Sequence, residues 1–172
     1  MTPAVTLRAI APDDLPAFFD HQRDPEAVRM AAFQTREREA FMAHWAKIMA
    51  DPTADNRTIV ADGHVAGNIG AWTDGSERLI GYWVGREFWG RGVATAALTL
   101  FLREVSRRPL IARVAKHNHG SIRVLQKCGF VAIGVDTCPE PDGQSVDEVV
   151  FSLSAPPSAF ASPACSMPEI SD

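Results

Sequence analysis

The glycine-bearing turn Trp89-Gly-Arg-Gly-Val-Ala94 has residue types suited to holding an anion. A β-rich run leads into it and an amphipathic helical pattern leads out of it, so it joins a strand to the start of a helix. Gly90 and Gly92 let the backbone come close to a ligand, because neither carries a Cβ. The first N–H groups of the helix, at 93–95, have no partners within the helix and point outward at the positive end of its dipole. The turn therefore predicts a phosphate cradle, with Arg91 as a cation at its rim.

Two familiar phosphate-binding motifs do not fit this turn. A P-loop requires G-x-x-x-x-G-K-[ST], and neither Lys nor Ser follows Gly92 in that pattern. A dinucleotide-binding fold requires G-x-G-x-x-G and an acidic residue about 20 residues later. Here Thr95 stands in the place of the third glycine, and the later region at 107–110 has no acidic residue. On this turn alone, a dinucleotide-binding fragment and a glycine turn that serves only chain geometry both stay open.

The elements that must position the turn predict an α/β domain. Apolar periodicity and capping residues predict helices from 12 to about 22, from 25, from 35, from 92 to 108 and from 118 to 128. The third of these carries an apolar stripe at Phe41, Trp45, Ile48 and Met49. Strand patterns lie at 4–10, 57–61, 65–72, 79–85, 110–115, 131–136 and 147–153. The Asp62-Gly63 pair predicts a hairpin turn between the second and third strands.

Size and composition limit what these elements can form. A chain of 172 residues with 46% hydrophobic content is long enough for one packed domain and too short for two. After Ser154 the sequence becomes rich in Pro, Ser and Ala without any period. We therefore expect a domain at 1–154 and a flexible tail at 155–172.

Charge and cysteine content exclude several classes of protein. The formal net charge of -4 argues against nucleic acid and membrane as partners, because both rely on excess Lys and Arg. It slightly favours a cationic partner. Three widely spaced cysteines without a C-x-x-C pair, and no leader-like apolar run, favour a cytoplasmic protein. His117 and His119 flank Asn118 but have no third ligand at suitable spacing, so we expect no metal site.

A second motif, Asn118-x-x-Ser121-x-x-x-Leu125-x-x-x-Gly129-Phe130, follows the turn. With it, the chain resembles the GNAT superfamily of N-acetyltransferases over roughly residues 5–153. The family's cofactor signature, Q/R-x-x-G-x-G/A, falls on the turn, with Trp89 departing from Gln or Arg at the first position. The two motifs together are similar to the branch that includes the bacterial ribosomal-protein alanine and serine N-acetyltransferases.

The resemblance implies a fold and a co-substrate. The fold would be a mixed, strongly twisted and mostly antiparallel sheet with helices on both faces. Its fourth and fifth strands, at 79–85 and 110–115, would splay apart so that the pantetheine arm of acetyl-CoA enters between them. The cofactor-binding residues that the resemblance implies are Tyr82, Trp83, Val84, Trp89, Gly90, Arg91, Gly92, Val93, Ala94, Thr95, Asn118 and Ser121. An amide near Trp83 and Val84 would stabilise the developing oxyanion.

The catalytic residues that the resemblance implies start at the second motif. Asn118 is expected to cap its helix and to contact pantetheine. Other family members place a tyrosine seven residues after this asparagine to protonate the departing thiolate, and here that residue is Leu125. Ser121 would then do this work, directly or by orienting water, or the proton would come from solvent.

The general base is less defined by the sequence. Glu77, Glu87 and the hydroxyl of Tyr82 are candidates, but we expect proton removal through a water wire with no single essential residue. Met30, Phe33, Phe41 and Trp45 are candidates for the wall of an acceptor pocket. The predicted reaction is acetyl transfer to a primary amine of a protein N-terminus or a small molecule. The sequence is compatible with a homodimer. The alternative is a non-catalytic module that senses acyl-CoA.

Overall fold

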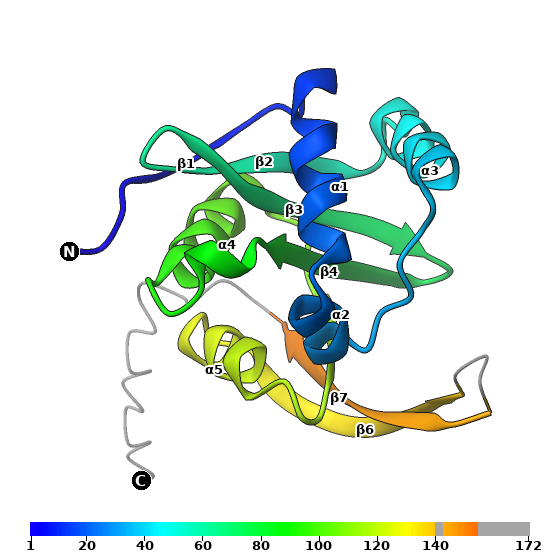
Figure 1. Cartoon of the computed structure of the whole chain (residues 1–172). Helices are drawn as coiled ribbons and strands as arrows, with labels where there is room; N and C mark the ends of the chain where they lie inside the picture. The colour runs from blue at the N-terminus through cyan, green and yellow to red at the C-terminus, as the bar shows by residue number, and fades with distance from the viewer. Residues whose placement is uncertain (140–142, 155–172) are drawn as a thin grey trace, which may run out of the picture.

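The chain folds around one seven-stranded sheet, shown in Figure 1. This computed structural model describes residues 1–139 and 143–154. The strands are β1 Val5–Arg8, β2 Asp55–Ala61, β3 His64–Asp74, β4 Glu77–Val84, β5 Leu110–Ala115, β6 Val131–Pro139 and β7 Ser145–Leu153. The helices are α1 Leu15–Arg23, α2 Pro25–Ala31, α3 Arg38–Ala50, α4 Val93–Glu104 and α5 His119–Lys127, with short 3₁₀ turns η1 Pro12–Asp14 and η2 Arg86–Phe88.

The sheet opens between its two central strands. The strand order is β1-β2-β3-β4-β5-β7-β6, and every neighbouring pair is antiparallel except β4 and β5. These two run parallel and are in register only at Leu79 and Ile111. Beyond Leu79, the edge of β4 that faces β5 has no strand partner, although its other edge pairs with β3 as far as Val84. The predicted splay of these two strands is confirmed.

Two hydrophobic clusters hold helices against the sheet. One cluster joins α1 to α3 through Leu15, Phe18, Phe19, Phe41 and Trp45. The other packs α4, through side chains that include Leu98 and Phe101, against residues of the sheet such as Ile59, Ile69 and Phe151. In Figure 1, α1 crosses the sheet over β3 and β4, and α3 lies beside it. The predicted mixed α/β fold is confirmed.

Capping residues lie at both ends of α5, as its sequence predicts. The Asn118 side chain accepts a hydrogen bond from the Ser121 N–H at its start, at 3.1 Å. At its end Gly129 has a φ of 90°, and the Phe130 N–H donates to the Leu125 carbonyl at 3.0 Å. This left-handed ending turns the chain into β6 and buries Phe130 beside Leu125.

The helix α4 is shorter than its pattern predicts. It ends at Glu104 and not at Arg108, because Val105 takes an extended conformation and buries its side chain in the core. The Arg108 guanidinium then donates to the carbonyls of Leu102 and Val105, which have no helical N–H partner once α4 has ended. The predicted tail at 155–172 lies outside the described residues, and within the described part no helix has the length and apolar character needed to cross a bilayer.

Candidate active site

Two cavities meet at the splayed edge of β4. The first, which we call the cradle cavity, has a volume of about 430 Å³ and lies between β4, the start of α4 and α5. The second, the aromatic cavity, has a volume of about 480 Å³ and lies between α1, α3 and the strands β2, β3 and β4. Tyr82 and Trp83 line both of them. A molecule in one cavity can therefore meet a molecule in the other at these two residues.

Backbone geometry at the far end of the cradle cavity suits an anion. Gly90 and Gly92 have φ values of 69° and 78°, in the left-handed region that glycine adopts without strain. The Gly92 carbonyl accepts the Ala96 N–H at 3.0 Å, so α4 begins directly after this glycine. No side chain caps the helix, which leaves the N–H groups of residues 93–95 open beside the positive end of its dipole. This is the geometry that holds phosphate.

Trp89 and Arg91, two residues of the turn, differ in whether they line the cradle cavity. Trp89 lines the cradle cavity, and its indole N–H donates to the Val84 carbonyl at 2.8 Å, which ties the turn to the end of β4. Arg91 lines neither of the two cavities. Its guanidinium lies 3.2 Å from the Asp62 carboxylate in the β2–β3 turn. Its role as a rim cation stays a prediction.

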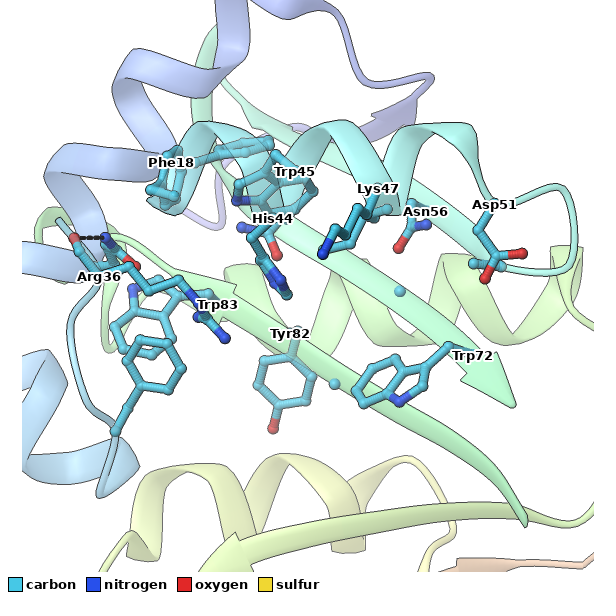
Figure 2. A pocket seen from close by; sticks show the side chains of 18 residues that line it. Phe18, Arg36, His44, Trp45, Lys47, Asp51, Asn56, Trp72, Tyr82 and Trp83 are labelled. Carbon is cyan, nitrogen blue, oxygen red and sulfur yellow. Dashed lines mark hydrogen bonds between the residues drawn. The ribbon is translucent and has the colours of Figure 1, made fainter. Parts of the chain in front are cut away.

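A pair of hydroxyl groups closes the junction between the cavities. The Tyr82 and Ser121 hydroxyl oxygens are 2.7 Å apart, which links β4 to α5 across the splay. Figure 2 shows the Tyr82 ring at the base of the aromatic cavity with its hydroxyl directed toward α5. Burial raises the pKa of Tyr82 to about 12, against an opposing effect of its bond to Ser121. The phenol therefore stays protonated near neutral pH. Asn118, Ser121 and Tyr82, which the sequence singled out, come together here.

The two carboxylate candidates for the base lie elsewhere. Glu77, at the exposed start of β4, is 3.3 Å from the Arg113 guanidinium and lines neither cavity. Glu87 is 3.4 Å from a ring nitrogen of His21 and also lines neither cavity. Of the three groups that the sequence offers as a base, only the Tyr82 hydroxyl is at the junction.

The aromatic cavity contains a polar residue that the sequence analysis missed. His44 projects from α3 toward Tyr82, as Figure 2 shows. It lies between Phe41 and Ile48 on the cavity-facing side of α3, whereas Met49, predicted for that stripe, is exposed and does not line the cavity. The sequence did contain a signal for His44. It stands three positions after Phe41 and four before Ile48, which is the spacing of residues on one helix face.

The environment of His44 favours the neutral form of its imidazole. Burial lowers its pKa below the ordinary value of 6.5, and the positive charges of Arg36 and Lys47 lower it further. Both cations line the same cavity, and so do Asp51 and Tyr82, the remaining titratable groups of its wall. A neutral imidazole can accept a proton from a substrate at this position. The described residues contain no group of three or more His, Cys, Asp or Glu side chains placed to hold a metal ion.

Comparisons with known proteins place the chain in a family. Residues 4–131 match the family described as the acetyltransferase (GNAT) domain. A search of curated proteins gives no match. Among solved structures, a T. thermophilus protein provisionally assigned as an acetyltransferase is 29% identical, with a TM-score of 0.67 over 87% of this chain and 85% of that one.

Two more distant structures share the fold. The Vibrio cholerae spermidine N-acetyltransferase, in complex with CoA and spermine, is 16% identical, with a TM-score of 0.73 over 87% of this chain and 95% of that one. The ribosomal L7/L12 alpha-N-protein acetyltransferase RimL, in complex with coenzyme A, is 18% identical, with a TM-score of 0.76 over 90% of this chain and 96% of that one. Since the family match covers most of its length, the chain belongs to the GNAT acetyltransferase family.

Proposed function

We propose that the protein transfers the acetyl group of acetyl-CoA to a primary amine, which attacks the thioester directly. One observation carries this proposal: a cavity with an open helix N-terminus meets a second cavity at Tyr82 and Trp83. Two substrates held in the two cavities would react at this junction without a covalent acyl-enzyme intermediate. Holding them in that geometry accounts for much of the rate enhancement expected of such a site.

The cradle cavity suits acetyl-CoA along its whole length. The pyrophosphate binds at the turn and the open N–H groups of 93–95, and the pantetheine arm follows the unpaired edge of β4 at 82–84 as a missing strand would. Asn118 and Ser121 line the opposite side of this path. The thioester then reaches the junction, where a free amide near Trp83 and Val84 polarises its carbonyl.

The hydroxyl pair acts on the departing sulfur. The amine nitrogen bonds to the thioester carbon, the C–S bond breaks, and the thiolate of CoA leaves. A free thiol has a pKa of about 8.5, well below the value of about 12 for Tyr82. Complete proton transfer from Tyr82 to the thiolate is therefore uphill, and the Tyr82–Ser121 pair instead stabilises the thiolate by hydrogen bonding until it takes a proton from solvent. This pair takes the place of the family tyrosine that Leu125 replaces.

His44 is the group best placed to remove the proton from the amine. It faces the junction from the acceptor side, and its lowered pKa leaves it free to accept a proton near neutral pH. This assignment differs from the water wire without an essential residue that the sequence favoured. Base catalysis of this kind contributes about 10²–10⁴-fold in rate, and we expect the lower end here, because an α-amino group with a pKa near 8 is already partly neutral.

The experiment that tests the function measures CoA thiol release from acetyl-CoA with a panel of primary amines, followed by mass spectrometry of the products. We expect acetylated product and stoichiometric thiol for at least one amine. The rival function is a sensor that binds acyl-CoA without turnover. Binding of CoA with no thiol release from any amine would favour that rival and contradict the proposal.

A further inference from the structure

The aromatic cavity is built to receive an apolar body. Phe18 and Trp45 form its inner wall with ring centroids 5.0 Å apart, and both are buried. Trp72 of β3 forms its outer rim with 41% of its surface exposed. Its indole lies against Gly81 of the neighbouring strand, where a Cβ would be only 3.2 Å from the ring. Exposed indole surface on the rim of such a cavity favours a ring or another apolar group as its occupant.

The charges of the same cavity are mainly positive. Arg36 and Lys47 line it, and neither forms an ion pair with any residue in the described part of the chain. The one carboxylate of the lining is Asp51, whose oxygen already accepts hydrogen bonds from the Thr53 N–H and hydroxyl at 2.8 and 2.7 Å. Figure 2 places Asp51 at the far end of α3 from Arg36.

Arg36 is fixed near the junction. Its backbone carbonyl accepts a hydrogen bond from the Gln22 side chain at 3.0 Å, and its guanidinium lies 5.3 Å from the centroid of the Phe33 ring. Phe33 in turn packs edge-on against Trp83, with ring centroids 5.3 Å apart. Figure 2 shows the guanidinium reaching into the cavity beside Trp83. A guanidinium held in this way and without a carboxylate partner is a ready bidentate donor to a ligand anion.

We propose that the acceptor is a small amine with a carboxylate close to its amino group and an apolar, ring-sized body, as in an aromatic α-amino acid. This inference rests on the proposed function and names its substrate class. Arg36 holds the carboxylate, the amino group faces the thioester at Tyr82 and His44, and the ring packs between Trp45 and Trp72. A polyamine would instead place further positive charge beside Arg36 and Lys47.

Matched pairs of amines test this substrate class on the full chain. L-Phenylalanine is compared with phenethylamine, and L-tryptophan with tryptamine, so that only the carboxylate differs, and spermidine and a short peptide with a free N-terminus complete the panel. Thiol release from acetyl-CoA gives kcat/KM for each amine. We expect each amino acid to exceed its decarboxylated partner by about 10–100-fold, which is the contribution of a charge-assisted hydrogen bond.

The Arg36→Gln variant tests whether this arginine is the origin of the preference. At pH 8, where the lowered pKa leaves His44 neutral with or without the charge of Arg36, it should lower kcat/KM for phenylalanine by about 10–100-fold, through KM. It should change kcat/KM for phenethylamine by less than about threefold. Arg38→Gln is the matched control, because Arg38 is exposed on α3, packs over Phe19 and lines neither cavity. That control should keep the full preference for the carboxylate. An unchanged shift of the melting temperature by CoA shows that each variant is folded.

The outcomes separate this inference from the proposed function. Thiol release that is fastest with phenethylamine, spermidine or the peptide would overturn the substrate class and leave acetyl transfer standing. A carboxylate preference that survives in a folded Arg36→Gln variant would overturn the assignment of Arg36. Thiol release with none of the amines would overturn the acetyltransferase function and this inference with it.

Discussion

The two cavities that meet at Tyr82 differ in the groups that they offer to a ligand. The cradle cavity binds its ligand mainly through backbone: two left-handed glycines and the first N–H groups of α4 at its phosphate end, and the unpaired edge of β4 along its length. The aromatic cavity presents side chains that come from α1, α3 and three strands. Backbone groups can recognise a phosphate or an amide whatever the neighbouring side chains are. A change of acceptor therefore requires new side chains on one side of β4 only.

This difference explains why the cofactor was easier to predict than the acceptor. The cradle is continuous in sequence, and its glycines are required by backbone conformation. The aromatic cavity joins Arg36, His44 and Trp72, which come from a loop, a helix and a strand. The net charge of -4 favoured a cationic acceptor, whereas the charges that line the cavity are mainly positive. Total charge is a property of the whole surface and does not set the charge of one site.

The largest expected effect tests whether the cradle cavity binds CoA through its backbone groups. In Gly92→Val, a β-branched residue is forced to a φ of 78° at the start of α4. We expect the rise in melting temperature that CoA causes in the natural protein to be almost abolished, because the open N–H groups lose their arrangement. Gly63→Val is the matched control, since Gly63 has a φ of 81° in the β2–β3 turn and lines neither cavity.

Both variants should unfold at a lower temperature, because both place a side chain in the left-handed region. Only Gly63→Val should keep the shift that CoA causes. A full shift in a folded Gly92→Val protein would contradict the placement of the pyrophosphate.

The second effect concerns the hydroxyl pair at the junction. We expect Ser121→Ala and Tyr82→Phe each to lower kcat by about 10–100-fold, with CoA affinity changed by less than about threefold. The double variant should be no more than a few-fold slower than either single variant, since two groups 2.7 Å apart act as a unit. Steady-state kinetics at saturating acetyl-CoA gives all three values. Fully multiplicative losses would show that the two hydroxyls act independently.

The third effect tests a side chain of the aromatic cavity, His44. We expect His44→Asn to lower kcat/KM by about 10–100-fold. In the natural protein the rate should fall as pH drops through the His44 pKa, because the imidazole then becomes protonated and cannot accept a proton. Since that pKa is lowered, this loss should occur below pH 6.5. A pH profile of kcat/KM checks it, and the same inflection in His44→Asn would exclude His44 as its origin.

The sequence predicted the fold well wherever a local signal agreed with the packing. β5 lies where its apolar run predicts, and α5 begins and ends at its capping residues. The end of α4 was missed, because only the tertiary core shows that Val105 is buried in an extended conformation. His44 was missed because a histidine breaks an apolar stripe, and the stripe was completed with Met49 instead. Contacts between distant segments, such as Tyr82 with Ser121, cannot be derived from local spacing.

The smallest expected effect concerns Arg91, the cation that the sequence placed at the rim of the backbone cradle. Its guanidinium and the Asp62 carboxylate are both about half exposed, at 45% and 51%. A contact from such a cation to phosphate is worth at most about 1 kcal/mol. We therefore expect Arg91→Ala to weaken CoA binding by about fivefold or less, and by less still at high salt, where the charge is screened. Binding titrations at two salt concentrations measure both changes.

Asp62→Asn sharpens this last test, because Asp62 and the phosphates compete for the same guanidinium. Asparagine tolerates the φ of 49° at this position and keeps an oxygen for the bond from the Ala4 N–H at 2.9 Å. If Asp62 holds Arg91 away from the cradle, Asp62→Asn should tighten CoA binding slightly in the natural protein and leave it unchanged in Arg91→Ala. A loss of CoA affinity of more than tenfold in Arg91→Ala, unreduced by salt, would contradict this prediction. It would mean that the Arg91 guanidinium enters the cavity and that phosphate binding depends on this side chain.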